Sequence, residues 1–85
     1  MKVKYIGETF YNGFGLTNNK TYECTDIIEE GFLEIIDDEN EETLYPIVNP
    51  RPIDDSSIGG KWEIVEDDNN LLKKEFEKYN LLWYN

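Results

Sequence analysis

The densest cluster of side chains with metal-binding chemistry is the acidic run at residues 37–42, Asp-Asp-Glu-Asn-Glu-Glu. Ca²⁺ prefers carboxylate and amide oxygens, and an EF-hand loop supplies them at alternating positions around a central glycine, ending in a bidentate glutamate. This run contains no glycine, and apolar residues flank it on both sides. We therefore interpret it as the polar tip of a β-hairpin and expect neither a metal nor another cofactor.

The sequence contains few residues that are suited to catalysis. The chain contains no histidine, which is the commonest general base at neutral pH. Its single cysteine, Cys24, has no histidine or second cysteine to activate it or to share a zinc ion, and it alternates with Tyr22 as in a half-buried strand. Gly13 and Gly15 precede a predicted strand, whereas a phosphate-binding loop needs a following helix. We expect Cys24 to be buried and the protein not to be an enzyme.

The charge and the composition limit which binding partners and which cellular compartment we expect. With 19 acidic and 8 basic residues the net charge is −11, which disfavours binding to nucleic acid and to anionic membranes. A basic protein partner remains open, and so does a simple role of the charge in solubility. One cysteine forms no internal disulfide, and no segment has the roughly 18 apolar residues of a membrane span. We expect a cytoplasmic protein, and the scarcity of alanine beside abundant Ile, Asn, Lys, Glu and Tyr indicates a bacterial or phage source.

Alternation of polar and apolar residues predicts five short strands. They cover residues 2–6, 20–25, 32–37, 43–45 and 61–65. A glycine-rich segment with aromatic residues, 7–19, and a segment with all three prolines, 46–60, read as long loops. Five short strands with such loops favour a small barrel over a βαβ fold, and closing the sheet would remove exposed edges.

After Val65 the periodicity changes to that of a helix. The run Asp67-Asp68-Asn69-Asn70 supplies N-cap residues and negative charge where the helix dipole favours it. An apolar stripe follows at helical spacing, formed by Leu72, Phe76, Tyr79 and Trp83. Because an isolated helix of this length is marginal in water, we expect the stripe to dock on the barrel or on a second copy. The expected single domain thus has a barrel at 1–66 and a helix at 67–85.

Several short motifs in residues 1–66 resemble those of small bacterial and phage proteins of uncharacterised function. The motifs are Lys2-Val3-Lys4-Tyr5-Ile6-Gly7, Leu16-Thr17 with Lys20-x-Tyr22-Glu23, Ile35-Ile36-Asp37-Asp38, Leu44-Tyr45-Pro46 and Trp62-Glu63-Ile64-Val65. The resemblance implies a mainly β fold, a small SH3-like five-stranded barrel, here followed by a C-terminal amphipathic α-helix. It implies no activity and no binding residues.

Aromatic residues are the candidates for a binding surface. SH3 domains hold proline-rich segments between aromatic side chains, with loop acids facing a basic residue of the ligand. If this barrel bound peptides, its groove would be lined by Phe10, Tyr11, Phe14, Tyr45 and Trp62. In so small a chain many aromatic residues must also fill the core, and the early loop holds only one acid, Glu8.

Three functions remain open at this point. The first is a non-enzymatic protein-interaction module with a protein or peptide partner, which would be basic if charge guides recognition. The second is an acidic inhibitor or immunity-type protein that mimics nucleic acid and occupies a basic groove. The third is a structural protein that forms homo-oligomers through the stripe of Leu72, Phe76, Tyr79 and Trp83.

Overall fold

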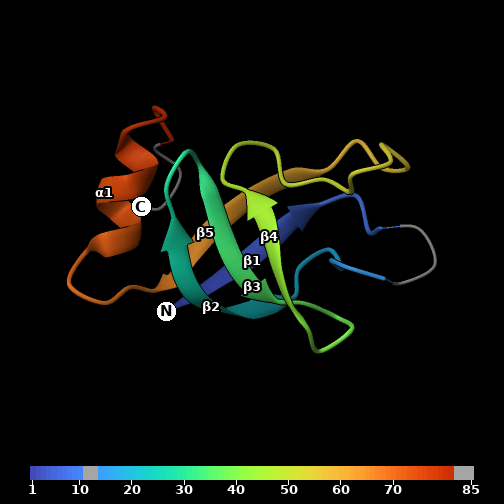
Figure 1. Ribbon diagram of the computed structural model, residues 1–85, viewed down its shortest axis with the longest axis horizontal. Coiled ribbons are helices and arrows are strands. Elements are labelled where there is room, and N and C mark those ends of the chain that lie inside the picture. Colours follow the sequence, from blue (N-terminus) through green and yellow to red (C-terminus); the bar gives the residue numbers. More distant parts are fainter. Residues whose placement is uncertain (11–13, 82–85) are drawn as a thin grey trace.

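A five-stranded antiparallel sheet and a short C-terminal helix make up the computed structural model, which describes residues 1–10 and 14–81 (Figure 1). The strands are β1 (Lys2–Gly7), β2 (Thr21–Ile28), β3 (Phe32–Ile36), β4 (Glu42–Pro46) and β5 (Gly60–Glu66), and the helix is α1 (Leu71–Glu77). The prediction of a mainly β chain with five strands and a C-terminal helix is confirmed. No helix in the described ranges is long and apolar enough to cross a membrane.

The sheet has the strand order β4-β3-β2-β1-β5, which makes β4 and β5 its edges. The first half of β2 pairs with β1 and the second half with β3, and the β2–β3 register shifts between Cys24 and Asp26. Such an irregularity bends a strand and increases its twist, so β2 serves both halves of a curved sheet. Backbone pairing does not join β4 to β5 in the described chain, and the closed barrel therefore stays a prediction.

The core lies on the concave face of the sheet. Alternate residues of each strand point to opposite faces, and the inward set is fully or almost fully buried. It comprises Val3, Tyr5, Tyr22, Cys24, Leu33, Ile35, Tyr45 and Trp62, joined by Phe10, Leu16 and Ile47 from the loops. The strand assignments from alternation succeed because this periodicity is a local property of the chain.

Helix α1 contributes its apolar face to this same core. The side chains of Leu72 and Phe76 are fully buried among the core residues. The Asp67 carboxylate accepts hydrogen bonds from the N–H groups of Leu72 (2.8 Å) and Lys73 (3.0 Å), which satisfies donors that have no partner within the helix. The predicted run thus contains the N-cap residue, Asn70, but the side-chain hydrogen bonds come from Asp67, and the first turn of the helix holds no acid.

The predicted helical stripe is longer than the helix itself. α1 ends at Glu77, and Asn80 adopts a left-handed φ of 58° that a helix cannot continue. The N–H of Leu81 then bonds back to the carbonyl of Phe76 at 3.1 Å. Tyr79 follows the helix and is half-buried, packed against the core, while Trp83 lies outside the described residues.

The helix and the two long connections lie at opposite ends of the molecule. In Figure 1, α1 stands near the N-terminus, whereas the β1–β2 and β4–β5 connections extend from the other end of the sheet. We call these connections the early loop (residues 8–20, of which 11–13 are outside the described part) and the late loop (residues 47–59). They meet at the candidate site.

Candidate functional site

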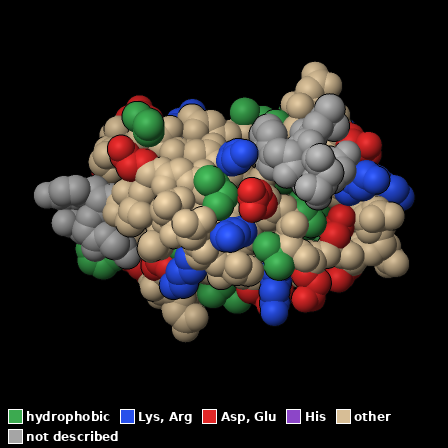
Figure 2. All heavy atoms as spheres, turned by 180° about the vertical axis from the view of Figure 1, so that it is seen from behind, with side chains coloured by type: hydrophobic (Ala, Val, Ile, Leu, Met, Phe, Trp, Pro, Cys, Tyr) green, Lys and Arg blue, Asp and Glu red, His purple; other side chains and the backbone are tan. Residues whose placement is uncertain are grey.

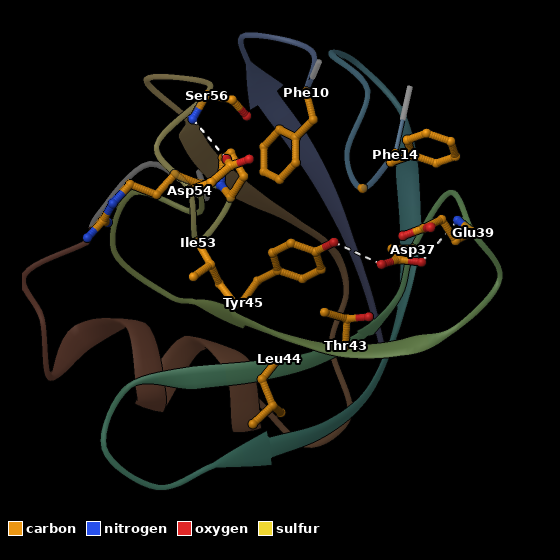
Figure 3. A pocket seen from close by; sticks show the side chains of 13 residues that line it. Phe10, Phe14, Asp37, Glu39, Thr43, Leu44, Tyr45, Ile53, Asp54 and Ser56 are labelled. Atoms are coloured by element: carbon orange, nitrogen blue, oxygen red, sulfur yellow. Dashed lines mark hydrogen bonds between the residues drawn. The ribbon is translucent and has the colours of Figure 1, made fainter. Parts of the chain in front are cut away.

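A groove of about 440 Å³ opens at the loop end of the sheet. It lies between the early loop, the β3–β4 hairpin and the late loop. Its lining residues are Phe10, Phe14, Gly15, Asp37, Glu39, Thr43, Leu44, Tyr45, Arg51, Pro52, Ile53, Asp54 and Ser56. In Figure 3, Phe14 and Glu39 stand on one side, Ile53 and Asp54 on the other, and the rings of Phe10 and Tyr45 lie between them.

The floor of the groove is formed by two buried rings, Phe10 and Tyr45. They meet edge to face with centroids 6.0 Å apart, and each also contacts one ring beneath the floor: Tyr5 packs against Phe10 (5.8 Å) and Trp62 against Tyr45 (6.4 Å). Edge-to-face pairs add about 0.5–1.5 kcal/mol beyond the burial of their area. The floor is therefore part of the core and presents a preformed surface.

Trp62 does not reach this surface. Its side chain is fully buried and its indole N–H donates to the carbonyl oxygen of Pro46 at 3.0 Å. Of the two places considered for Trp62, the core and a binding surface, the structure shows the core. A chain of this size needs its largest ring to fill the core.

The early loop places Phe14 on the rim. The N–H of Phe10 donates to the Leu16 carbonyl at 2.9 Å, which closes the loop beside the floor. Gly15 has a φ of 120°, and a Cβ there would lie 2.5 Å from Cδ2 of Phe10. Only glycine permits this backbone so close to the ring. Phe14, one residue earlier, is left 61% exposed.

Asp37 supports the floor from the hairpin. Its Oδ2 accepts the hydroxyl of Tyr45 at 2.9 Å, and its Oδ1 accepts the backbone N–H groups of Glu39 (3.0 Å) and Glu41 (3.4 Å). Burial, followed by the hydrogen bond to Asp37, raises the pKa of the Tyr45 hydroxyl well above its ordinary value. The predicted polar hairpin tip at residues 37–42 is thus not exposed throughout, because Asp37 at its start is buried.

Asp38 ties the hairpin to the early loop. Its carboxylate accepts hydrogen bonds from Lys20 Nζ (2.6 Å), Thr17 Oγ1 (2.8 Å) and the Tyr22 hydroxyl (2.9 Å), and its N–H donates to the Gly15 carbonyl (2.9 Å). Burial alone would raise the pKa of the Asp38 carboxyl, but these hydrogen bonds hold it below its usual value. Asp38 thus remains ionised and fixes one wall of the groove relative to the other elements.

The late loop forms the opposite wall. Its base is held by the Glu8 carboxylate, which accepts the N–H of Ile58 at 3.2 Å. The Asp54 carboxylate accepts the N–H of Ser56 at 3.0 Å, and hydrogen bonds from Ser56 lower the pKa of this exposed group. Ile53 beside it is fully exposed. An isoleucine in that position gains little from folding and is available for contact with another molecule.

The groove therefore combines apolar and acidic surface. Phe14 and Ile53 present exposed apolar side chains, and Glu39 and Asp54 stand beside them as acids. Among the described residues that line the groove, Arg51 is the one cation, and it lies 3.7 Å from the Asp55 carboxylate. An apolar surface flanked by carboxylates suits a ligand with apolar groups and positive charge.

The predicted binding residues are distributed over three environments. Phe10 and Tyr45 line the groove, Phe14 stands on its rim, and Trp62 is enclosed in the core. Tyr11 lies outside the described residues. Sequence reasoning missed Ile53 and the acids beside it, because the late loop has no periodicity that assigns a side chain to a surface. The signal available was an isolated isoleucine between prolines and polar turn residues.

The other features considered from the sequence are a reactive cysteine, a metal site and a surface for self-association. Burial raises the pKa of the Cys24 thiol to about 11, which keeps it protonated at neutral pH. Residues 1–10 and 14–81 contain no cluster of His, Cys, Asp and Glu arranged to hold a metal ion. The stripe residues Leu72 and Phe76, considered for self-association, are buried in this chain's own core.

Comparison with protein-family models, with curated proteins and with solved structures found no match for this chain.

Proposed function

We propose that this chain is a non-enzymatic protein-interaction module that binds a basic segment of another protein in the groove. The observation that carries the proposal is the pairing of exposed Phe14 and Ile53 across an aromatic floor, each beside an acid of the groove wall (Figure 3).

The apolar groups supply the driving force for association. Burying a side chain such as Phe14 or Ile53 contributes about 1.5–3 kcal/mol relative to leaving it in water. The floor of Phe10 and Tyr45 is held by ring contacts and by Asp37, so the site needs little ordering when a ligand binds. A rigid apolar centre with a polar rim is the usual arrangement of energetic hot spots.

The acids select the charge of the partner. Glu39 and Asp54 stand at the groove of a chain whose net charge is −11. A negative field of this kind attracts lysine and arginine side chains and disfavours acidic ones. The proposed ligand is thus a segment that carries both basic and apolar side chains.

The proposal includes an SH3-like barrel as the fold, in a bacterial or phage protein of the cytoplasm. The strand order, with β2 shared between both halves of the sheet, supports that fold. So does the contact between the two sheet edges through Trp62 and Pro46.

The two other functions considered from the sequence receive less support. The face in Figure 2 carries Lys and Arg interspersed with Asp and Glu, so this face is not the aligned row of acids that a nucleic-acid mimic presents. Self-association through the stripe conflicts with the burial of Leu72 and Phe76.

Peptide display against the immobilised full-length chain tests the proposal. We expect enrichment of sequences that contain lysine or arginine together with apolar residues, with binding that weakens as salt is added. Ile53→Asp should abolish binding of the selected peptides. Ile58→Asp is the matched control, because Ile58 is an exposed isoleucine of the same loop that does not line the groove. Equal binding by the two variants, or enrichment of acidic peptides, would contradict the proposal.

A further inference from the structure

Two hydrogen bonds, one at each end of the β3–β4 pairing, show which residues of β4 direct their backbone groups toward β3. The N–H of Ile47 donates to the Gly31 carbonyl at 2.8 Å, and the N–H of Asp37 donates to the Glu41 carbonyl at 3.0 Å. Both contacts continue the β3–β4 register, and hydrogen-bonded positions in an antiparallel ladder recur at every second residue. Residues 43 and 45 therefore direct their backbone groups toward β3, and residues 42, 44 and 46 direct theirs away from the sheet.

The end of this outward row is already used within the chain. Pro46 has no N–H to leave unpaired, and its carbonyl accepts the indole N–H of Trp62. β4 is an edge strand, so no further strand of the described chain pairs with the outward groups of Glu42 and Leu44. An edge with unpaired N–H and C=O groups is a template for another strand.

This open part of the edge borders the groove. Leu44 is among the residues that line the groove, yet Figure 3 shows its side chain on the opposite side of β4 from Tyr45 and Thr43. Leu44 therefore lines the groove with its backbone. The Leu44 side chain is 50% exposed on the outer face of the sheet, where its position would match the alternate side chains of an added strand.

We propose that the bound segment pairs as an additional β-strand with the outward edge of β4 at Leu44 and Glu42. This inference rests on the proposed function, since it names how the basic segment binds in the groove. Backbone hydrogen bonds supply affinity in strand addition, and pockets for alternate side chains supply specificity. One face of the added strand contacts Phe14, Ile53 and the nearby acids, and the other lies beside the Leu44 side chain.

A pair of substitutions at residue 44 isolates the backbone contribution. Leu44→Pro removes an N–H that points away from the sheet and leaves every N–H donor to β3 in place. Pro46 shows that β4 accepts proline at a position with the same orientation. Leu44→Ala keeps the N–H and removes most of the side chain. The probe is a capped peptide of alternating lysine and valine, and binding is measured by fluorescence anisotropy. We expect Leu44→Pro to bind about tenfold more weakly than Leu44→Ala. Equal affinities of the two variants overturn the inference.

A second measurement leaves the protein unchanged. One version of the peptide carries N-methyl groups on its valines and the other carries them on its lysines. Pairing with β4 predicts that one version binds like the parent and the other about tenfold more weakly, because only alternate N–H groups face the edge. Equal affinity of both methylated peptides overturns strand addition while leaving the proposed function intact. Failure of the parent peptide to bind the wild-type protein counts against the proposed function itself.

Discussion

The indole N–H of Trp62 on β5 donates a hydrogen bond of 3.0 Å to the carbonyl oxygen of Pro46 at the end of β4. These two strands are the opposite edges of the sheet. The sheet therefore curves far enough for a side chain of one edge to reach the backbone of the other. Because a side chain and not a backbone ladder makes this contact, the rest of the β4 edge stays open beside the groove.

Replacing Trp62 by phenylalanine tests that contact. The ring is retained in part, but the Pro46 carbonyl loses its donor, so we expect a loss of about 1–3 kcal/mol in the free energy of unfolding. Trp62→Ala also leaves a cavity and should cost about 3–5 kcal/mol. Urea unfolding followed by circular dichroism measures both, with Val65→Ala as an exposed control on the same strand. Wild-type stability of Trp62→Phe would show that the contact does not stabilise the fold.

Phe76 and Leu71 form a matched pair for the role of the helix. Phe76 is fully buried in the core, and Leu71, five residues earlier at the start of the helix, is exposed. We expect Phe76→Ala to cost about 3–5 kcal/mol, whereas Leu71→Ala should stay within about 0.5 kcal/mol of wild type. Thermal unfolding monitored by circular dichroism supplies the comparison.

Gel filtration of the same two variants addresses self-association. If the helix served a second copy, Phe76→Ala would shift the elution volume toward a smaller species without lowering stability. We expect instead the same elution position for the folded wild type and Leu71→Ala, with the effect of Phe76→Ala confined to stability.

The elements of this fold were predictable where the information is local. Alternation places Val3, Tyr22 and Leu33 on the buried face of their strands without any knowledge of their neighbours. The start of α1 was predictable for the same reason, since Asp67 caps a turn close to it in sequence. The end of α1 was not, because the apolar spacing continues past Asn80, whose left-handed φ ends the helix.

The groove was only partly predictable because its walls are brought together over long distances. The aromatic residues Phe10, Phe14 and Tyr45 drew attention by type alone. The inward orientation of Asp37 and Asp38 depends on partners that the fold supplies, among them hydroxyls and an amine on other elements. A single sequence does not indicate which acid of a run will meet them.

Gly15→Ala tests how the early loop shapes the groove. The added Cβ would lie within 2.5 Å of the Phe10 ring at a φ of 120°, so we expect a loss of about 1–3 kcal/mol in stability. Phe10→Ala in the same chain removes the ring atoms that clash. The double variant should therefore lose less than the sum of the two single losses, as measured by urea unfolding. Simple additivity would mean that backbone strain alone causes the effect.

Asp38 should give the stability of the protein a specific dependence on acid. Its hydrogen bonds with Lys20, Thr17 and Tyr22 lower the pKa of the carboxyl in the folded state. A group whose pKa is lower in the folded state stabilises the fold above its unfolded pKa of about 3.9, and this stabilisation is lost as the pH falls through the folded pKa. Asp38→Asn should be less stable than wild type at neutral pH, and the difference should shrink as the pH falls below about 4. Urea unfolding at a series of pH values measures the stability of both proteins.

Glu77→Gln removes the same charge from the exposed surface of α1 and so separates the local effect from a change in net charge. A constant difference between wild type and Asp38→Asn down to the lowest pH would show that the carboxylate charge does not hold the early loop to the hairpin.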